Sequence, residues 1–245
     1  MKKLFAIVVL MLMFSCKEKA ANIDFAQAIV DKSIAASGGD LYKTKNIDFA
    51  FRDRDYILNR ENGQRILKRK FKKDSSIITD VTNGVDFQRF EDGVNLIVPD
   101  SMAVKYLNAI NSVHYFAYLP FGLNDGAVNK EYIGDEKIKG ETYHKIKVTF
   151  DKEGGGKDYD DEYLYWFNTK TFHPDYLGYL YHVDGGGIRF RAAYNARVVN
   201  GIRFVDYENY KPQNEAITVE ALSTAYKNNT LELLSKIDLK DIKVY

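Results

Sequence analysis

The sequence has little of several features that define common protein classes. Among its 245 residues there are one cysteine and four prolines, and 35 lysines and arginines are balanced by 34 aspartates and glutamates. A single cysteine excludes an internal disulfide and a zinc site built from thiolates. A formal net charge of +1, without a local cluster of basic residues, argues against nucleic acid as a partner. The composition is that of a folded globular chain.

The sequence also lacks the short motifs of common active sites. Its four histidines show no His-Glu-x-x-His or His-x-His spacing, and no Gly-x-Ser-x-Gly nucleophile elbow is present. The stretches Gly154 to Gly156 and Gly185 to Gly187 do not have P-loop spacing, and we expect them at hairpin tips, where φ is positive. We therefore predict no cofactor, no metal and no catalytic residue, which makes an enzyme the third choice of function.

One acidic run needs a separate interpretation. Asp158 to Glu162 contains four carboxylates and could bind calcium through its oxygens, but EF-hand spacing is absent. Arg189 and Arg191 share one face of a candidate neighbouring strand. Cross-strand ion pairs between arginines and the acidic run are the simpler interpretation.

The N-terminus contains the one long apolar run. Met-Lys-Lys is followed by Leu4 to Phe14, almost without a polar group, and then by Ser15 and Cys16. Eleven apolar residues are too few to cross a bilayer as a helix but suit a secretory signal peptide. The lone cysteine at its end is similar to a bacterial lipobox. The sequence thus predicts that residues 1–15 are removed and that Cys16 carries a diacylglycerol thioether and an amide-linked acyl chain such as palmitate.

Lipidation of Cys16 determines the expected location. Two or three acyl chains anchor a protein stably, whereas one holds it only reversibly. We expect residues 16–22 to form a lipidated tether and residues 23–245 a single domain. The predicted location is the cell envelope, with the protein anchored by its lipid to the outer membrane, on the periplasmic face or at the cell surface.

The hydrophobic pattern predicts a mostly β fold of the α+β class. An amphipathic helix, which Asp24 can cap, starts at Phe25 and stops at Gly38 and Gly39, and a period of two follows from Ile47. Asn-Gly and Asp-Gly pairs mark hairpins, and Asp100 to Leu119 interrupts the strands with a helical pattern. About ten or eleven strands and two or three helices are expected, with a closing strand from Leu231 to Val244. Because several strands are apolar on both faces, we predict an open, strongly curved antiparallel half-barrel with the helices on its concave side.

Aromatic residues are the strongest indication of a binding site. The 18 tyrosines and 15 phenylalanines concentrate on strands that are apolar on both faces, and tyrosine combines an apolar body with a polar group. A packed aromatic core without a cavity is the alternative. The candidate apolar pocket comprises Tyr106, Ile110, Phe116, Tyr163, Tyr165, Trp166, Tyr179 and Tyr181. Asn111, His114 and Tyr118 share one helical face and form a candidate polar site, in which a buried structural histidine is the simpler interpretation.

Three stretches resemble a known protein family. They are NSVHYFAYLPFGLNDGAVNKEYIG (Asn111 to Gly134), TFDKEGGGKDYDDEYLYWFN (Thr149 to Asn168) and DGGGIRFRAAYNARVVNGIRFVDYENY (Asp184 to Tyr210). They resemble a family of uncharacterised lipoproteins of Bacteroidota, and the resemblance covers about Ile23 to Tyr245. The family's architecture is similar to that of the LolA and LolB lipoprotein carriers, which implies a half-barrel plugged by helices. It implies no reaction and no catalytic residue.

These observations favour a membrane-anchored lipoprotein that binds a lipid or another apolar ligand in a half-barrel. The alternative is a surface or structural lipoprotein with a solid core, whose tyrosines contact a glycan or a protein partner. The membrane, reached through the acyl chains on Cys16, and an apolar small molecule are the expected partners. No oligomeric state is assigned.

Overall fold

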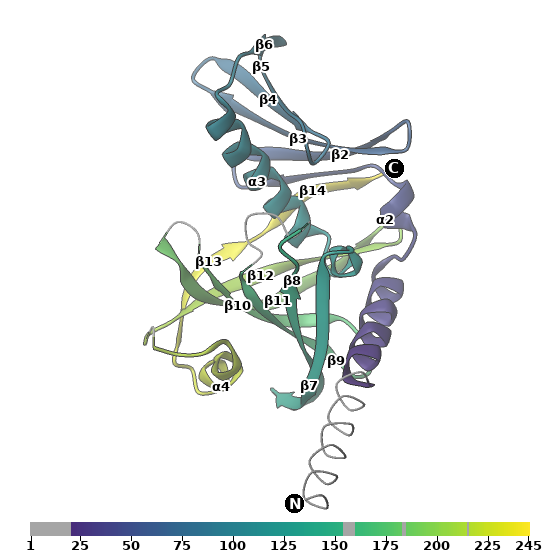
Figure 1. Ribbon diagram of the computed structural model, residues 1–245, viewed down its shortest axis with the longest axis vertical. Coiled ribbons are helices and arrows are strands. Elements are labelled where there is room, and N and C mark those ends of the chain that lie inside the picture. The colour runs from purple at the N-terminus through teal and green to yellow at the C-terminus, as the bar shows by residue number, and fades with distance from the viewer. Residues whose placement is uncertain (1–20, 154–159, 183–184, 215) are drawn as a thin grey trace, which may run out of the picture. The chain divides into compact units, whose positions relative to one another are not determined.

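The computed structural model describes residues 21–153, 160–182, 185–214 and 216–245 (Figure 1). Within these residues the chain forms two antiparallel sheets of seven strands each, together with a few helices. Two compact units can be distinguished by their internal contacts. The described residues of 1–36, 123–192 and 210–233 form the first unit, and those of 37–122, 193–209 and 234–245 form the second.

Sheet A lies in the second unit and has the strand order β14-β1-β2-β3-β4-β5-β6. The strands are β1 (Ile47–Phe51), β2 (Arg54–Glu61), β3 (Gln64–Lys73), β4 (Ser76–Thr82), β5 (Phe87–Glu91), β6 (Val94–Leu96) and β14 (Leu239–Val244). The turn residues Asn62 and Gly63 both have positive φ, at 51° and 78°, as a two-residue hairpin requires. Sheet A is therefore a meander to which β14 is added beside β1.

Sheet B has the strand order β13-β12-β11-β10-β9-β8-β7. Its strands are β7 (Val128–Ile138), β8 (Glu141–Phe150), β9 (Glu162–Asn168), β10 (Pro174–Tyr181), β11 (Gly187–Val199), β12 (Ile202–Pro212) and β13 (Leu231–Ile237). β7 to β10 belong wholly to the first unit, and β11 to β13 each have residues in both.

One face of sheet B is a solid core, which we call the α4 face. Here Trp166 of β9 packs with Tyr176 of β10 and Phe190 of β11 against the short helix α4 (Leu222–Lys227) and the 3-10 turn η4 (Val219–Ala221). Gly178 permits this packing, because a Cβ there would lie 2.8 Å from the Leu222 side chain. Burial of a large apolar side chain stabilises by about 1.5–3 kcal/mol, so this cluster contributes heavily to the unit.

Glu136 supplies the polar end of the α4 face. Its carboxylate accepts hydrogen bonds from Trp166 Nε1 at 2.9 Å, Ser223 Oγ at 2.7 Å and Lys227 Nζ at 2.8 Å. Partial burial acts to raise the pKa of Glu136, but these three bonds together outweigh it and hold the pKa below its usual value. The carboxylate therefore fixes α4 to β7 and β9 while it remains ionised.

The N-terminal helix, residues 21–37, packs on β7 and β8 in the first unit. The Phe25 ring lies 4.8 Å from that of Tyr132 and 5.4 Å from that of His144, both in edge-on contacts. The helix ends at Gly38, whose φ of 134° a residue with a side chain rarely adopts.

Helix α3 (Asp100–Ala117) contacts β3 and β5 of sheet A in the second unit (Figure 1). Beneath it the wholly buried Asp80 of β4 binds two arginines of neighbouring strands. Arg69 approaches the carboxylate to 2.6 Å and Arg89 to 2.7 Å. The Arg89 guanidinium also lies 3.7 Å from the ring centre of Tyr106 on α3. A carboxylate shared by two guanidiniums thus links three strands to the helix.

The predicted mostly β fold with an open antiparallel sheet is confirmed, and three details are corrected. The described residues form fourteen strands in two sheets, not ten or eleven strands in one. The helix expected to start at Phe25 already includes residue 21, so Asp24 is not its cap. The single closing strand expected over Leu231 to Val244 is divided at Asp238 into β13 of sheet B and β14 of sheet A.

None of the helices in the described ranges is both long enough and apolar enough to cross a membrane. The predicted signal peptide and Cys16 lie outside the described residues, as do Gly154 to Gly156 and Asp158. Gly185 and Gly186 lie between β10 and β11 and Gly187 begins β11, and all three have positive φ, as expected for a hairpin tip.

Candidate functional site

The face of sheet B opposite α4 carries a ladder of tyrosines. In β9 and β10, Tyr163 and Tyr179 are direct cross-strand partners, and the next partner of Tyr179 is Arg189 of β11. The row below runs through Tyr165, Leu177 and Arg191 in the same strands. We call this surface the tyrosine face and define it by Tyr163, Tyr165, Tyr179, Tyr181, Arg189 and Arg191. Strand alternation places these side chains on the face away from Trp166.

The rings on the tyrosine face are stacked. Tyr163 lies parallel to Tyr179 at 5.2 Å between ring centres, and Tyr165 extends the stack at 6.2 Å from Tyr163. The Tyr181 ring is tilted by 47° against that of Tyr179 at 6.0 Å. Tyr165 is fully buried, whereas Tyr163, Tyr179 and Tyr181 are half-buried. The face therefore changes along its strands, from closed packing at Tyr165 to partly accessible rings near the β10–β11 hairpin.

Each arginine of β11 leans over a tyrosine of β10. Arg189 Nη2 donates to the Tyr181 hydroxyl at 2.9 Å, and Arg191 Nη2 donates to the Tyr179 hydroxyl at 2.9 Å. The two guanidiniums also lie 5.3 Å and 5.1 Å from the ring centres of the same tyrosines. In these two contacts Arg189 keeps its full positive charge, because neither the ring nor the hydroxyl is an anion.

Gly187 makes room for the first of these pairs. A Cβ at this position would lie 2.8 Å from the Tyr181 hydroxyl and 3.1 Å from Arg189 Nη1, and the φ of Gly187 is 152°. Both the conformation and the space therefore require glycine. The last glycine of the hairpin has a packing role beyond turning the chain.

A hollow lies elsewhere in the first unit. It has a volume of about 380 Å³ and is bounded by the N-terminal helix, β7 and β8, with Ile23, Gln27, Lys130 and Lys147 in its wall. Burial lowers the pKa of Lys130, although Asp31 and Asp125 oppose the shift. The size is within the range of ligand sites, but the charged wall does not suit an acyl chain, and none of the predicted pocket residues lines it.

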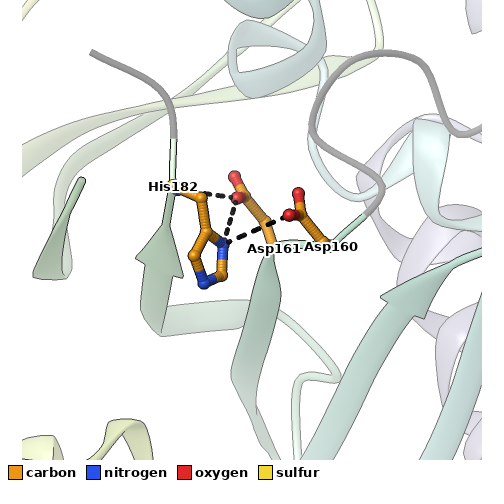
Figure 2. A group of neighbouring side chains, drawn as sticks. All are labelled: Asp160, Asp161 and His182. Carbon is orange, nitrogen blue, oxygen red and sulfur yellow. Dashed lines mark hydrogen bonds and ion pairs between the residues drawn. The ribbon is translucent and has the colours of Figure 1, made fainter. Parts of the chain in front are cut away.

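Three groups converge where β9 begins and β10 ends, as Figure 2 shows for Asp160, Asp161 and His182. The Nδ1 atom of His182 lies 3.3 Å from Asp161 and 3.9 Å from Asp160, and the His182 backbone N–H donates to Asp161 at 3.1 Å. Asp161 is buried, whereas the other two are exposed. Glu162 of the same acidic run pairs with Lys147 at 2.5 Å, not with an arginine as expected.

This cluster is the only set among the described residues that could offer a metal ion three ligand groups. One imidazole and two carboxylates suit a divalent cation with further positions open to water. The present contacts also satisfy the buried carboxylate of Asp161 without an ion. The absence of a metal site therefore stays a prediction.

The candidate polar site on α3 is an enclosed aromatic cluster. The wholly buried His114 bonds through Nδ1 to the Tyr118 hydroxyl at 2.9 Å, and its ring makes edge-on contacts with Phe49 and Tyr56 at 5.7 Å and 5.6 Å. Burial lowers the pKa of His114 to about 3, while a hydrogen bond with the Lys68 backbone opposes the shift. The Asn111 Oδ1 atom is buried without a hydrogen-bond partner among the described residues. A neutral, enclosed imidazole of this kind suits packing better than proton transfer at neutral pH.

The predicted pocket residues fall into three groups. Tyr163, Tyr165, Tyr179 and Tyr181 lie together on the tyrosine face. Trp166 is on the opposite face, fully buried in the α4 core. The remaining three, Tyr106, Ile110 and Phe116, belong to α3 in the other unit.

Arg189, Arg191 and Gly187 were not predicted as site residues. The alternation Arg-x-Arg on a strand next to Tyr-x-Tyr was the available signal, because two-residue spacing places each pair on one face. We instead assigned these arginines to ion pairs with the acidic run, so this signal was not used.

Among solved structures, the chain is similar to a LolA superfamily protein from Nitrosomonas europaea, with 15% identity and a TM-score of 0.47 over 89% of this chain and 92% of that one. A DUF1329 family protein from Desulfovibrio piger gives 10% identity and a TM-score of 0.43 over 89% and 92% of the two chains. A candidate outer-membrane lipoprotein-sorting domain from Vibrio parahaemolyticus gives 7% identity and a TM-score of 0.42 over 91% of this chain and 93% of that one.

No curated protein matches the chain. A family model, by contrast, matches residues 2–239, which is nearly the whole sequence. Its description is "Family of unknown function (DUF6503)". The chain therefore belongs to the DUF6503 family.

Proposed function

We propose that this protein is a membrane-anchored lipoprotein of the cell envelope that binds a lipid or another apolar ligand on its tyrosine face. The observation that carries the proposal is the partial exposure of Tyr163, Tyr179 and Tyr181, whose side chains lie on the same face as those of the fully buried Tyr165 and Val148. Large half-buried rings beside a buried apolar surface offer a ligand apolar area without loss of much side-chain entropy, because a tyrosine has only two χ angles.

The α4 face of the same sheet is closed by the protein's own side chains, unlike the tyrosine face. There Trp166, Phe190 and Leu222 are fully buried, and a glycine at position 178 lets α4 approach closely. A face closed by its own chain has no need of a ligand. The half-buried rings on the tyrosine face leave apolar area that a ligand can still cover.

Anchoring is supported by the sequence alone. Cys16 follows a charged start and an apolar run that is too short to span a bilayer. Acyl chains on Cys16 would keep the protein at the outer membrane, the surface from which it would take up or release its ligand.

Lipid binding is tested with the whole chain carrying Cys16→Ala, so that no acyl chain of its own competes. Mass spectrometry of an organic extract of the purified protein should find bound lipid. The protein should also bind a fluorescent fatty-acid analogue, and the extracted lipid should displace the analogue. Tyr179→Ser, which removes a central ring, should weaken binding of the analogue. Tyr194→Ser, which alters a half-buried tyrosine outside the tyrosine face, is the control.

A chain free of lipid that also fails to bind the analogue would refute the proposal. Binding of an oligosaccharide through the same tyrosines would favour the surface-recognition alternative. Anchoring has its own test, because labelled palmitate should be incorporated into the wild type and not into Cys16→Ser.

A further inference from the structure

Arg189 of the tyrosine face lies in an unusual charge environment. Arg189 is half-buried, and its described hydrogen bonds go to the Ile188 carbonyl at 2.8 Å and the Tyr181 hydroxyl at 2.9 Å. Among the described residues, no carboxylate forms an ion pair with it. A guanidinium has five N–H donors, so three remain for another acceptor. Partial burial of an unneutralised cation costs free energy, which a bound anion would recover.

The two arginines are arranged to act together. They occupy alternate positions of β11, roughly 7 Å apart along one face, and lie in the rows of Tyr179 and Leu177. Both lean toward the hairpin, where each bonds to the tyrosine hydroxyl one row closer to the tip. Positive charge and apolar rings therefore adjoin on one surface.

Gly187 leaves room for the first arginine in this position. Because a Cβ would intrude on both Tyr181 and Arg189, the glycine allows the guanidinium to lie close to the backbone at the start of β11. A hairpin needs glycine only to turn the chain, and the close approach at Gly187 is an additional constraint.

We infer that the ligand of the tyrosine face is an anionic amphiphile, whose oxyacid head group binds the guanidiniums of Arg189 and Arg191 while its chain covers the rings of Tyr163 and Tyr179. This inference rests on the proposed function and adds the chemical class of the ligand. Guanidinium pairs bind carboxylate and phosphate oxygens with favourable geometry, and the bond is strengthened by partial exclusion of water. A free fatty acid is the simplest molecule with both parts.

The test compares ligands that differ in one part only. Palmitate, hexadecanol and acetate are titrated against the whole chain carrying Cys16→Ala, with displacement of a fluorescent probe or calorimetry as readout. Palmitate should bind about 10- to 100-fold more tightly than hexadecanol, as expected for charge-assisted hydrogen bonds. Acetate, which has the head group without the chain, should bind far more weakly than either.

Variants should remove this preference without removing chain binding. Arg189→Gln and Arg191→Gln keep an amide donor for the tyrosine hydroxyl but lose the charge, so each should reduce the affinity for palmitate about tenfold and leave that for hexadecanol unchanged. Arg189→Lys should restore part of the preference. Arg65→Gln makes the same change at an exposed arginine of β3 and should have no effect. Circular dichroism and the binding of hexadecanol show that each variant is folded.

The outcomes separate this inference from the proposed function. Equal affinities for palmitate and hexadecanol would overturn the inference and leave apolar binding intact. Failure of both to bind would overturn the proposed function and the inference with it. Acetate binding as tight as palmitate would replace the amphiphile by a small anion and overturn the inference. A palmitate preference that persists in Arg189→Gln and Arg191→Gln would show that other groups bind the head group.

Discussion

The two sheets each hold a pair of arginines, and the two pairs differ in their partners and in their burial. In sheet A, Arg69 and Arg89 share the carboxylate of Asp80, and the whole group is enclosed beneath α3. In sheet B, Arg189 and Arg191 lie half-buried against tyrosines. Buried cations with their own counter-charge are part of a structural core. Arg189 forms no ion pair with a carboxylate of the described residues, and a half-buried cation of this kind is suited to bind an anion from outside.

The other polar groups of the two sheets differ in burial in the same way. Beneath sheet A, His114 is wholly buried and bonded to Tyr118 in an aromatic enclosure. On the tyrosine face of sheet B, Tyr163, Tyr179 and Tyr181 and the two arginines are half-buried. Substitutions beneath sheet A should therefore change stability, and those on the tyrosine face should change binding.

The largest effect is expected at Asp80. Asp80→Asn leaves two guanidiniums without a counter-charge and should lower the free energy of unfolding by about 3–5 kcal/mol, measured by urea denaturation. Asp74→Asn makes the same change at the exposed turn between β3 and β4 and should stay within about 0.5 kcal/mol of the wild type. Equal stabilities of the two variants would show that Asp80 is not what holds the arginines.

His114 should give sheet A a pH dependence. Its pKa in the folded chain is about 3, against an ordinary value of 6.5, so only the unfolded chain takes up a proton between these values. Stability should therefore be complete above about pH 6.5 and fall by about 1 kcal/mol per pH unit as the pH drops toward 3.

The contribution of His114 is isolated with two variants. His114→Gln should flatten the dependence on pH, measured by urea unfolding at a series of pH values. Tyr118→Phe removes the partner but not the titrating ring, so it should cost about 1 kcal/mol at neutral pH and keep the slope. An unchanged slope in His114→Gln would assign the dependence to carboxylates instead.

Within sheet B, the α4 face should behave like a core. Glu136→Gln weakens the bonds from Trp166, Ser223 and Lys227 and should cost about 1–2 kcal/mol of unfolding free energy. Glu141→Gln, at an exposed ion pair with Lys170, should cost less than about 0.5 kcal/mol. If Glu136→Gln cost no more than this control, the carboxylate would not be what fixes α4.

The smallest effect on stability is expected on the tyrosine face. Arg189→Gln should change the free energy of unfolding by less than about 1 kcal/mol, because it removes a cation that has no anion within the described residues. Arg69→Gln, by contrast, leaves Asp80 with one partner fewer and should cost about 3 kcal/mol. Losses of the same size would remove the distinction between the two arginine pairs. The measurement is thermal unfolding of ligand-free protein, followed by circular dichroism.

The sequence predicted elements well where a turn specified them. Asn62-Gly63 and Asp92-Gly93 placed their hairpins correctly, since residues that tolerate positive φ are required there. The hydrophobic pattern did not predict β7. Its sequence, VNKEYIGDEKI, alternates poorly because the strand lies at a sheet edge, where only Val128 and Ile138 are buried. Asp238 gave no signal for the division between β13 and β14, because assignment to a sheet depends on partners far away in the sequence.

The candidate site was only partly predictable for the same reason. Alternation correctly separated Tyr163 and Tyr165 from Leu164, but it could not tell which face α4 would cover. Trp166 was therefore grouped with residues on the other side of the sheet. The arginine contacts depend on the register between β10 and β11, which no local pattern specifies.

The place of β14 beside β1 bears on how the chain reaches its folded state. Ile47 pairs with Val244, about 200 residues further along the chain, and closing so long a loop is entropically costly and slow. During synthesis β1 can pair with β2, but its other edge must wait until residues 239–244 emerge from the ribosome. Sheet A therefore cannot be completed until residues 239–244 have been synthesised. Until then the outer edge of β1 lies unpaired, and an unpaired strand edge is open to wrong pairing with another chain.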